Sequence, residues 1–364
     1  MLVATEERTN GSMSMIDPTD ASASNTASIP PPKIRRGLFS DSVNSNKART
    51  GSHLKTCSSR SSFSVGWSIP SNPAVFLATS LRIRWKSYRN QIQECKKELS
   101  EISVHQLRLA TRRLMSHLAL VASVVSGDKA SKARKQLKHH LKPLGKLRDT
   151  QVQRIFIEQQ ETRFPSLILV RDFLRQREHD LVKDIARKAD LFKCRKMERW
   201  ILDLCQELDY LCDNRVKREL FALDLLSATA DAFRQAAFCR QTINPADVQT
   251  IHRTRVAFKK FRYMVEALSP DFTGLSKKQL RRLGNYQRRM GNLQDLEILQ
   301  DCVAQFLRKH PDNESSLVPF NRYVHLLRGR ALRSCLNHAD DIFLFWDSPR
   351  FGQSYHATLS RAAA

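Results

Sequence analysis

Three observations predict an all-α protein. From Asn72 onward apolar residues recur at intervals of three and four, as on the buried face of a helix. No segment shows the alternating pattern of a half-buried strand. The 364 residues include only 11 glycines and 13 prolines, which disfavours a turn-dense β fold and excludes a collagen-like chain. The apolar content of 41% suffices for a packed core.

The chain divides into an N-terminal tail and a series of helices. Residues 1–72 are rich in Ser, Thr, Asn and Pro and carry no apolar period, so we expect them to be disordered. Proline, glycine and polar clusters mark breaks in the remainder. The expected helices cover 74–98, 102–126, 129–148, 150–162, 165–189, 191–213, 215–240, 246–268, 275–293, 295–309 and 316–338. Pro143 should kink or divide the third of them.

Three of these helices carry apolar stripes that predict the core. The first stripe consists of Leu107, Ala110, Leu114, Leu118, Val121 and Val125. The second consists of Leu137, Leu141, Leu144 and Leu147, and the third of Phe258, Phe261, Val265 and Leu268.

The charge balance predicts a polyanionic partner. The sequence has 61 Lys and Arg against 36 Asp and Glu, a net charge of +25. Such a field attracts nucleic acid, anionic lipid or phosphate polymers. The eight cysteines show no C-x-x-C or zinc-finger spacing, which indicates reduced thiols. Because we also find no secretory signal and no apolar run of spanning length, we expect a cytoplasmic protein without a membrane partner.

An internal repeat organises the helices. The pattern apolar-His-x-x-Arg-apolar-Ala-x-basic-basic-apolar occurs at residues 104–114 and again at 251–261. Downstream, Leu144-Gly145 is followed by Asp149, and Met290-Gly291 by Asp295. Because both motifs recur in the same order at nearly the same offset, we predict two copies of one helical unit, divided near Asn214.

These paired motifs resemble the CHAD family, the conserved histidine α-helical domain, over residues 74–345. The resemblance implies two antiparallel four-helix-type bundles related by a pseudo-twofold axis, formed by residues 73–214 and 215–345 and followed by a tail, 346–364. It also implies a basic surface that binds inorganic polyphosphate. Some members are fused to a triphosphate tunnel domain. No E-x-E-x-K signature precedes the bundles here, so we do not expect phosphohydrolase activity.

The basic residues of both copies fall on helix faces opposite the apolar stripes. Few acidic residues accompany them, so the like charges repel unless an anion binds. We therefore predict a basic trough for an extended phosphate polymer, with arginine gripping oxygens and lysine acting as a point charge. The predicted binding residues are His105, Arg108, Arg112, Arg113, Lys135, Lys138, His139, Lys142, Lys146, His252, Arg255, Lys259, Lys260, Arg262, Lys277, Lys278, Arg281 and Arg288. The alternative is that these faces are simply solvated.

Other motif residues have two interpretations each. His105 and His252 either donate to phosphate or cap and pack their helices. Asp149 and Asp295 either cap a following helix or pair with a motif arginine. Gly145 and Gly291 indicate close helix approach or a break rather than phosphate contact.

Two other function classes compete. Nucleic-acid binding fits the charge, but Tyr263 is the only aromatic residue on the basic faces and no duplex-reading motif occurs. A metal-dependent phosphohydrolase is suggested only by the dipeptide His179-Asp180, which lacks supporting ligands. We therefore expect a non-enzymatic polyphosphate-binding module without metal or cofactor. It would target or scaffold proteins on polyphosphate granules, and its oligomeric state stays open.

Overall fold

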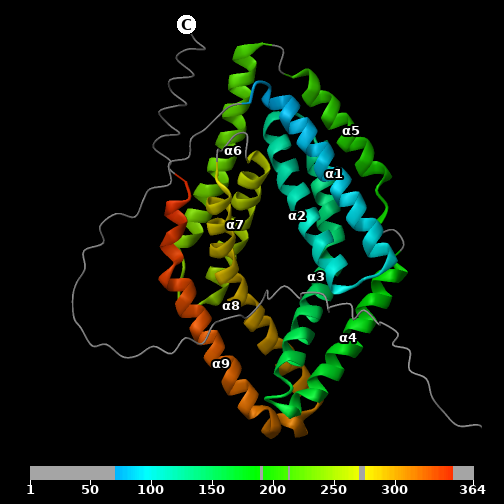
Figure 1. Cartoon of the computed structure of the whole chain (residues 1–364), viewed down its shortest axis with the longest axis vertical. Helices are drawn as coiled ribbons and strands as arrows, with labels where there is room; N and C mark the ends of the chain where they lie inside the picture. The colour runs from blue at the N-terminus through cyan, green and yellow to red at the C-terminus, as the bar shows by residue number, and fades with distance from the viewer. Residues whose placement is uncertain (1–69, 189–191, 212–213, 270–274, 347–364) are drawn as a thin grey trace, which may run out of the picture. The chain divides into compact units, whose positions relative to one another are not determined.

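The computed structural model describes residues 70–188, 192–211, 214–269 and 275–346, and every regular element within them is helical (Figure 1). This confirms the all-α prediction. Residues 1–69 of the tail predicted to be disordered lie outside the described residues, as do Cys57, Cys212 and the C-terminal tail from residue 347.

The helices follow the same order in both halves of the chain. The first half contains α1 (Pro73–Lys97), α2 (Glu101–Val124), α3 (Lys129–Gln160), the 3-10 helix η1 (Pro165–Leu167), α4 (Ile168–Arg187) and α5 (Arg195–Tyr210). The second half contains α6 (Arg215–Gln241), α7 (Val248–Leu268), α8 (Lys277–Lys309), η3 (Pro311–Asn313), α9 (Glu314–Asn337) and η4 (Ala339–Leu344). Each motif helix, α2 or α7, thus precedes a long helix, a proline-led turn and a further helix.

Polar side chains set the starts of several helices. Asn72 accepts hydrogen bonds from the first turn of α1, and Ser100 does so for α2. Asn214, at the predicted boundary between the copies, caps α6, and Asp247 caps α7. Ser276 forms a capping box with Gln279 at the start of α8, which satisfies two backbone donors that the helix leaves open.

Two predicted helix breaks are wrong, because α3 and α8 each run without interruption through their motif. Pro143 and Gly145 lie inside α3, and Gly291 lies inside α8. Asp149 and Asp295 are therefore interior residues and not N-caps. A glycine costs a helix only about 1 kcal/mol, and burial along the whole length of both helices outweighs that cost.

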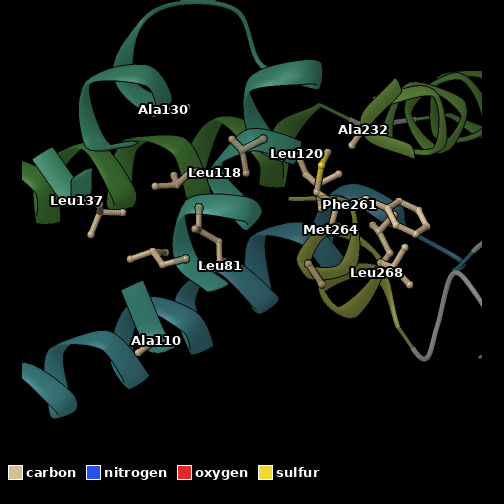
Figure 2. Packing of buried hydrophobic residues seen from close by; sticks show 14 of the residues in the cluster. Leu81, Ala110, Leu118, Leu120, Ala130, Leu137, Ala232, Phe261, Met264 and Leu268 are labelled. Atoms are coloured by element: carbon tan, nitrogen blue, oxygen red, sulfur yellow. The ribbon is translucent and has the colours of Figure 1, made fainter. Parts of the chain in front are cut away.

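That burial comes from two hydrophobic clusters, and both draw on both halves of the chain. The larger cluster joins α1, α2 and α5 to α6 and α7, and Figure 2 shows Leu118, Leu137, Phe261 and Leu268 among its members. The smaller cluster is built from the C-terminal parts of α3 and α8 with α4 and α9, and Phe320 is fully buried in it. The long helices α3 and α8 pass from one cluster into the other.

The three apolar stripes are confirmed as core. All their members are buried except Leu141, which is half-buried. The motif helices α2 and α7 pack against each other, and α3 packs against α8. The motif helices of the two copies are therefore direct neighbours.

Candidate functional site

Basic residues of both copies converge where α2 meets α7. Arg108 and Arg112 come from α2, and Arg255 and Lys259 come from α7. Their charges act on one another across the junction, since Arg255 lowers the pKa of Arg108 and Arg112 lowers the pKa of Arg255. Two carboxylates join them, Asp149 from α3 and Asp295 from α8. We call these four cations and two carboxylates the basic centre.

The cations of the basic centre are more buried than their helix positions predict. Lys259 is only 9% exposed, and the three arginines are partly covered. Burial is the main cause that lowers the pKa of Arg108 to about 10 and that of Lys259 to about 6, and the neighbouring guanidinium groups add to it. The α7 members of the basic centre, Arg255 and Lys259, are therefore covered by neighbouring groups and are not freely solvated.

The two carboxylates lie within reach of the arginine charges without forming close ion pairs. Burial raises the pKa of Asp149 and raises that of Asp295 to about 6, while Arg108 and Arg255 oppose the respective shifts. Among the described residues neither carboxylate has a cationic nitrogen within 4.0 Å, as the ion pairs in this range involve other acids. Of the two predicted roles, capping is wrong because both residues lie inside helices. The motif arginines act on both carboxylates only at longer range than an ion pair.

Each motif glycine lies next to a motif arginine. A β-carbon on Gly145 would lie 3.1 Å from Nη1 of Arg108, which is closer than ordinary van der Waals contact. A β-carbon on Gly291 would lie 3.8 Å from Nε and Nη2 of Arg255. Gly145 therefore permits a close approach of Arg108, as predicted, whereas a β-carbon at Gly291 would make only an ordinary contact with Arg255.

The two motif histidines occupy the edge of the basic centre. Nδ1 of the half-buried His252 donates a hydrogen bond to Oε1 of Gln294 on α8. Partial burial of its ring and the charge of Arg148 lower the pKa of His105. Gln294 and Arg148 hold equivalent places in the two copies. Neither residue is among the predicted site residues, although each directly precedes a motif aspartate.

Two predicted ligands, Arg113 and Arg262, lie close to Glu266, an acidic residue that is not among the predicted site residues. Arg262 donates from Nε to Glu266 at 2.8 Å and from Nη1 to Gln287 at 3.2 Å. Nε of Arg113 lies 4.0 Å from the same carboxylate. The expectation that acidic partners are almost absent is therefore wrong at this end of α7. Through its hydrogen bond to Gln287, Arg262 also links α7 to α8.

The remaining predicted residues lie at exposed positions of α3, α7 and α8. All of them are exposed, and none forms an ion pair with another described residue. They are Lys135, Lys138, His139, Lys142 and Lys146 on α3, Lys260 on α7, and Lys277, Lys278, Arg281 and Arg288 on α8. Their role as ligands stays a prediction, with a solvated surface as the alternative.

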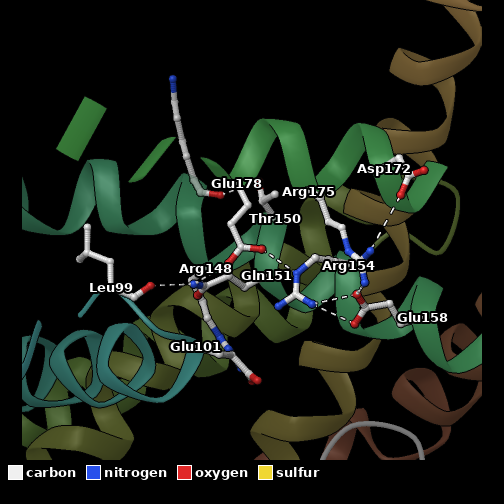
Figure 3. A network of polar contacts seen from close by, with 11 residues as sticks. Leu99, Glu101, Arg148, Thr150, Gln151, Arg154, Glu158, Asp172, Arg175 and Glu178 are labelled. Atoms are coloured by element: carbon white, nitrogen blue, oxygen red, sulfur yellow. Dashed lines mark hydrogen bonds and ion pairs between the residues drawn. The ribbon is translucent and has the colours of Figure 1, made fainter. Parts of the chain in front are cut away.

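A polar network between α3 and α4 shows how ordinary structural cations behave in this protein. Figure 3 shows Arg154 bonded to both Glu158 and Glu178, with Nε to Glu178 at 2.6 Å. Arg175 adds a second contact to Glu158 at 2.9 Å. Here every arginine finds a carboxylate at hydrogen-bond distance. Among the described residues, the four cations of the basic centre have no carboxylate within 4.0 Å.

The dipeptide that suggested a metal-dependent phosphohydrolase has no cluster of possible metal ligands around it among the described residues. His179 and Asp180 are exposed on α4, and Oδ1 of Asp180 accepts a hydrogen bond from Gln176. Within the part of the chain that the structure describes, no three His, Cys, Asp or Glu side chains cluster in a way that could hold a metal ion. No described helix is long and apolar enough to cross a membrane.

Comparisons with known proteins agree with the motifs. The crystal structure of the CHAD domain from the plant Ricinus communis is 17% identical, with a TM-score of 0.48, over 81% of this chain and 96% of that chain. A search of curated proteins finds no match. The family model of the CHAD domain matches residues 84–304, which include α2, α7 and the whole basic centre. The chain therefore belongs to the CHAD domain family.

Proposed function

We propose that this protein binds inorganic polyphosphate at the basic centre, without catalysing a reaction on it. The observation that carries this proposal is the convergence of Arg108, Arg112, Arg255 and Lys259 from both copies around only two carboxylates. Burying like charges together is unfavourable unless an anion compensates them. Phosphate oxygens supply that compensation, and arginine side chains match their geometry.

A long phosphate chain suits the surroundings of the basic centre better than a single phosphate ion. Lys138, Lys142 and Arg288 are exposed on α3 and α8, the helices that also carry Asp149 and Asp295. We infer that they extend the positive surface beyond the junction of α2 and α7. A helix of 21 residues such as α7 is about 30 Å long. We infer that affinity rises with chain length and then saturates, and that orthophosphate competes weakly.

A competition titration tests the proposed ligand. Long polyphosphate, triphosphate, heparin and duplex DNA are compared at two salt concentrations, because non-specific polyanion binding is strongly salt-dependent. The proposal requires long polyphosphate to compete best at the higher salt. If duplex DNA competes equally well there, the protein is instead a general nucleic-acid binder.

A pair of variants tests the proposed site. Arg108→Gln with Arg255→Gln removes one motif arginine from each copy, and Arg195→Gln with Lys196→Gln removes two exposed charges at the start of α5. The first variant should weaken polyphosphate binding at least tenfold more than the control, a difference of about 1.4 kcal/mol. Circular dichroism and melting temperature establish that both fold. Equal losses would mean that only net charge matters.

We propose a targeting or scaffolding role on polyphosphate granules in the cytoplasm. A module that binds the polymer without cleaving it can hold an attached segment there. Localisation of the intact chain in cells with and without polyphosphate synthesis tests this role, and an unchanged distribution would refute it.

A further inference from the structure

Lys259 is an unusual member of the basic centre. It is 9% exposed, and the charged groups that act on it are Arg108 and Arg112 of α2, Arg255 of its own helix and Asp295 of α8. The helices α2, α6 and α8 all pack against α7, but no charged residue of α6 is among these groups. Three of the four neighbours are therefore guanidinium groups, and no described carboxylate lies within 4.0 Å of the amine.

A lysine that is buried among positive charges can lose its own charge, and an arginine cannot. A buried ammonium group can release its proton to become a neutral amine, whereas a guanidinium group stays charged in proteins. Burial, followed by the charges of Arg112 and Arg255, lowers the pKa of Lys259 to about 6. In the first copy the equivalent position is Arg112, which is more exposed. The two copies therefore place one permanent and one titratable cation at the same motif position.

Binding of an anion would shift the protonation equilibrium of Lys259 toward the charged form. A phosphate oxygen beside the amine supplies the negative charge that the free protein lacks, which favours the ammonium form. We propose that Lys259 takes up one proton from solution when a phosphate chain binds at the basic centre, so that binding strengthens as the pH falls. This inference rests on the proposed function and adds a proton as a second ligand of the same site.

The sign and size of the effect follow from linkage. Between the free and bound pKa values of Lys259, each unit of lower pH should tighten binding by up to about tenfold. Asp149, Asp295 and the polymer also titrate, so total proton uptake cannot be assigned to Lys259 without variants. Lys259→Arg keeps the charge at every pH, and the equivalent position already holds an arginine. Lys259→Met removes the charge at every pH with a side chain of similar length.

Calorimetry of the full chain with long polyphosphate separates these contributions. Titrations in buffers of different ionisation enthalpy, at about pH 6.5 and about pH 8.5, report the number of protons taken up. At the higher pH the wild type should take up close to one proton more than either variant. Lys259→Arg should bind tightly at both pH values, and Lys259→Met weakly at both.

The outcomes distinguish this inference from the proposed function. If the wild type binds polyphosphate with the same proton uptake and pH dependence as both variants, Lys259 is not the proton acceptor and the inference fails, while the binding function stands. If the wild type does not bind polyphosphate at either pH, both proposals fail. Lys259→Met alone suffices for the comparison if the arginine variant does not fold.

Discussion

The two motif glycines offer a matched pair of substitutions whose outcomes should differ. Alanine in place of a helix-interior glycine gains about 0.5–1 kcal/mol of stability, because it restricts the unfolded chain and favours the helix. At Gly291 the new β-carbon would meet Arg255 at 3.8 Å, an ordinary contact. Gly291→Ala should therefore stabilise the protein by nearly the full amount and leave polyphosphate binding unchanged.

At Gly145 the new β-carbon would lie 3.1 Å from Nη1 of Arg108, so the guanidinium group must move by a few tenths of an ångström. That group is the end of a flexible side chain, and its movement should cost little stability. It should nevertheless disturb a phosphate contact, weakening binding by about 1 kcal/mol, or roughly fivefold.

Urea denaturation and calorimetric titration measure the two effects separately. Gly284→Ala is a further control, since its β-carbon would approach Arg262 no closer than 3.9 Å. If Gly145→Ala binds polyphosphate as Gly291→Ala does, the position of Arg108 against α3 does not matter for binding. If all three variants are less stable than the wild type, the glycines have a structural role that these contacts do not explain.

Three further predictions address neighbouring groups. Glu266→Gln should release Arg262 from its ion pair and steepen the dependence of polyphosphate affinity on salt by about one charge; an unchanged slope would show that Arg262 stays outside the site. Asp149→Asn with Asp295→Asn should lower the melting temperature of the free protein and enlarge its rise on adding polyphosphate, because the arginines then rely on the ligand; an unchanged rise in scanning calorimetry would contradict this. His140 is buried with its pKa lowered to about 4, so it resists protonation and should contribute up to about 3 kcal/mol to the decrease in the free energy of unfolding as the pH falls from about 6.5 to about 4; the total decrease, followed by urea denaturation, should be smaller in His140→Gln.

Sequence periodicity was sufficient to predict the helical core, because the buried residues of a helix recur along the chain at intervals of three and four. The stripe of Phe258, Phe261 and Val265 is buried as predicted. The same periodicity could not show that the opposite face of α7 is also covered, since contact between α2 and α7 joins residues about 147 positions apart. That contact buries Lys259, which helix geometry alone places on a solvated face.

The predicted break before Asp149 failed for a related reason. Proline and glycine close to an acidic residue usually mark a helix end, and Pro143, Gly145 and Asp149 follow that pattern. Here Gly145 instead leaves room for Arg108 from another helix. The residues around Gly145 in the sequence do not indicate that contact. Repetition of the motif in the second copy indicated its importance but not its physical cause.

The passage of α3 and α8 through both hydrophobic clusters has a consequence for how the protein unfolds. Each cluster is assembled from both halves of the chain. Cleaving the chain near Asn214 would therefore separate the two sequence copies, but each hydrophobic cluster would still need residues from both fragments. Neither half could retain its packing after the other melts, so heating should give a single cooperative transition. Two fragments produced separately would then gain their structure only by associating with each other, as the subunits of an obligate dimer do.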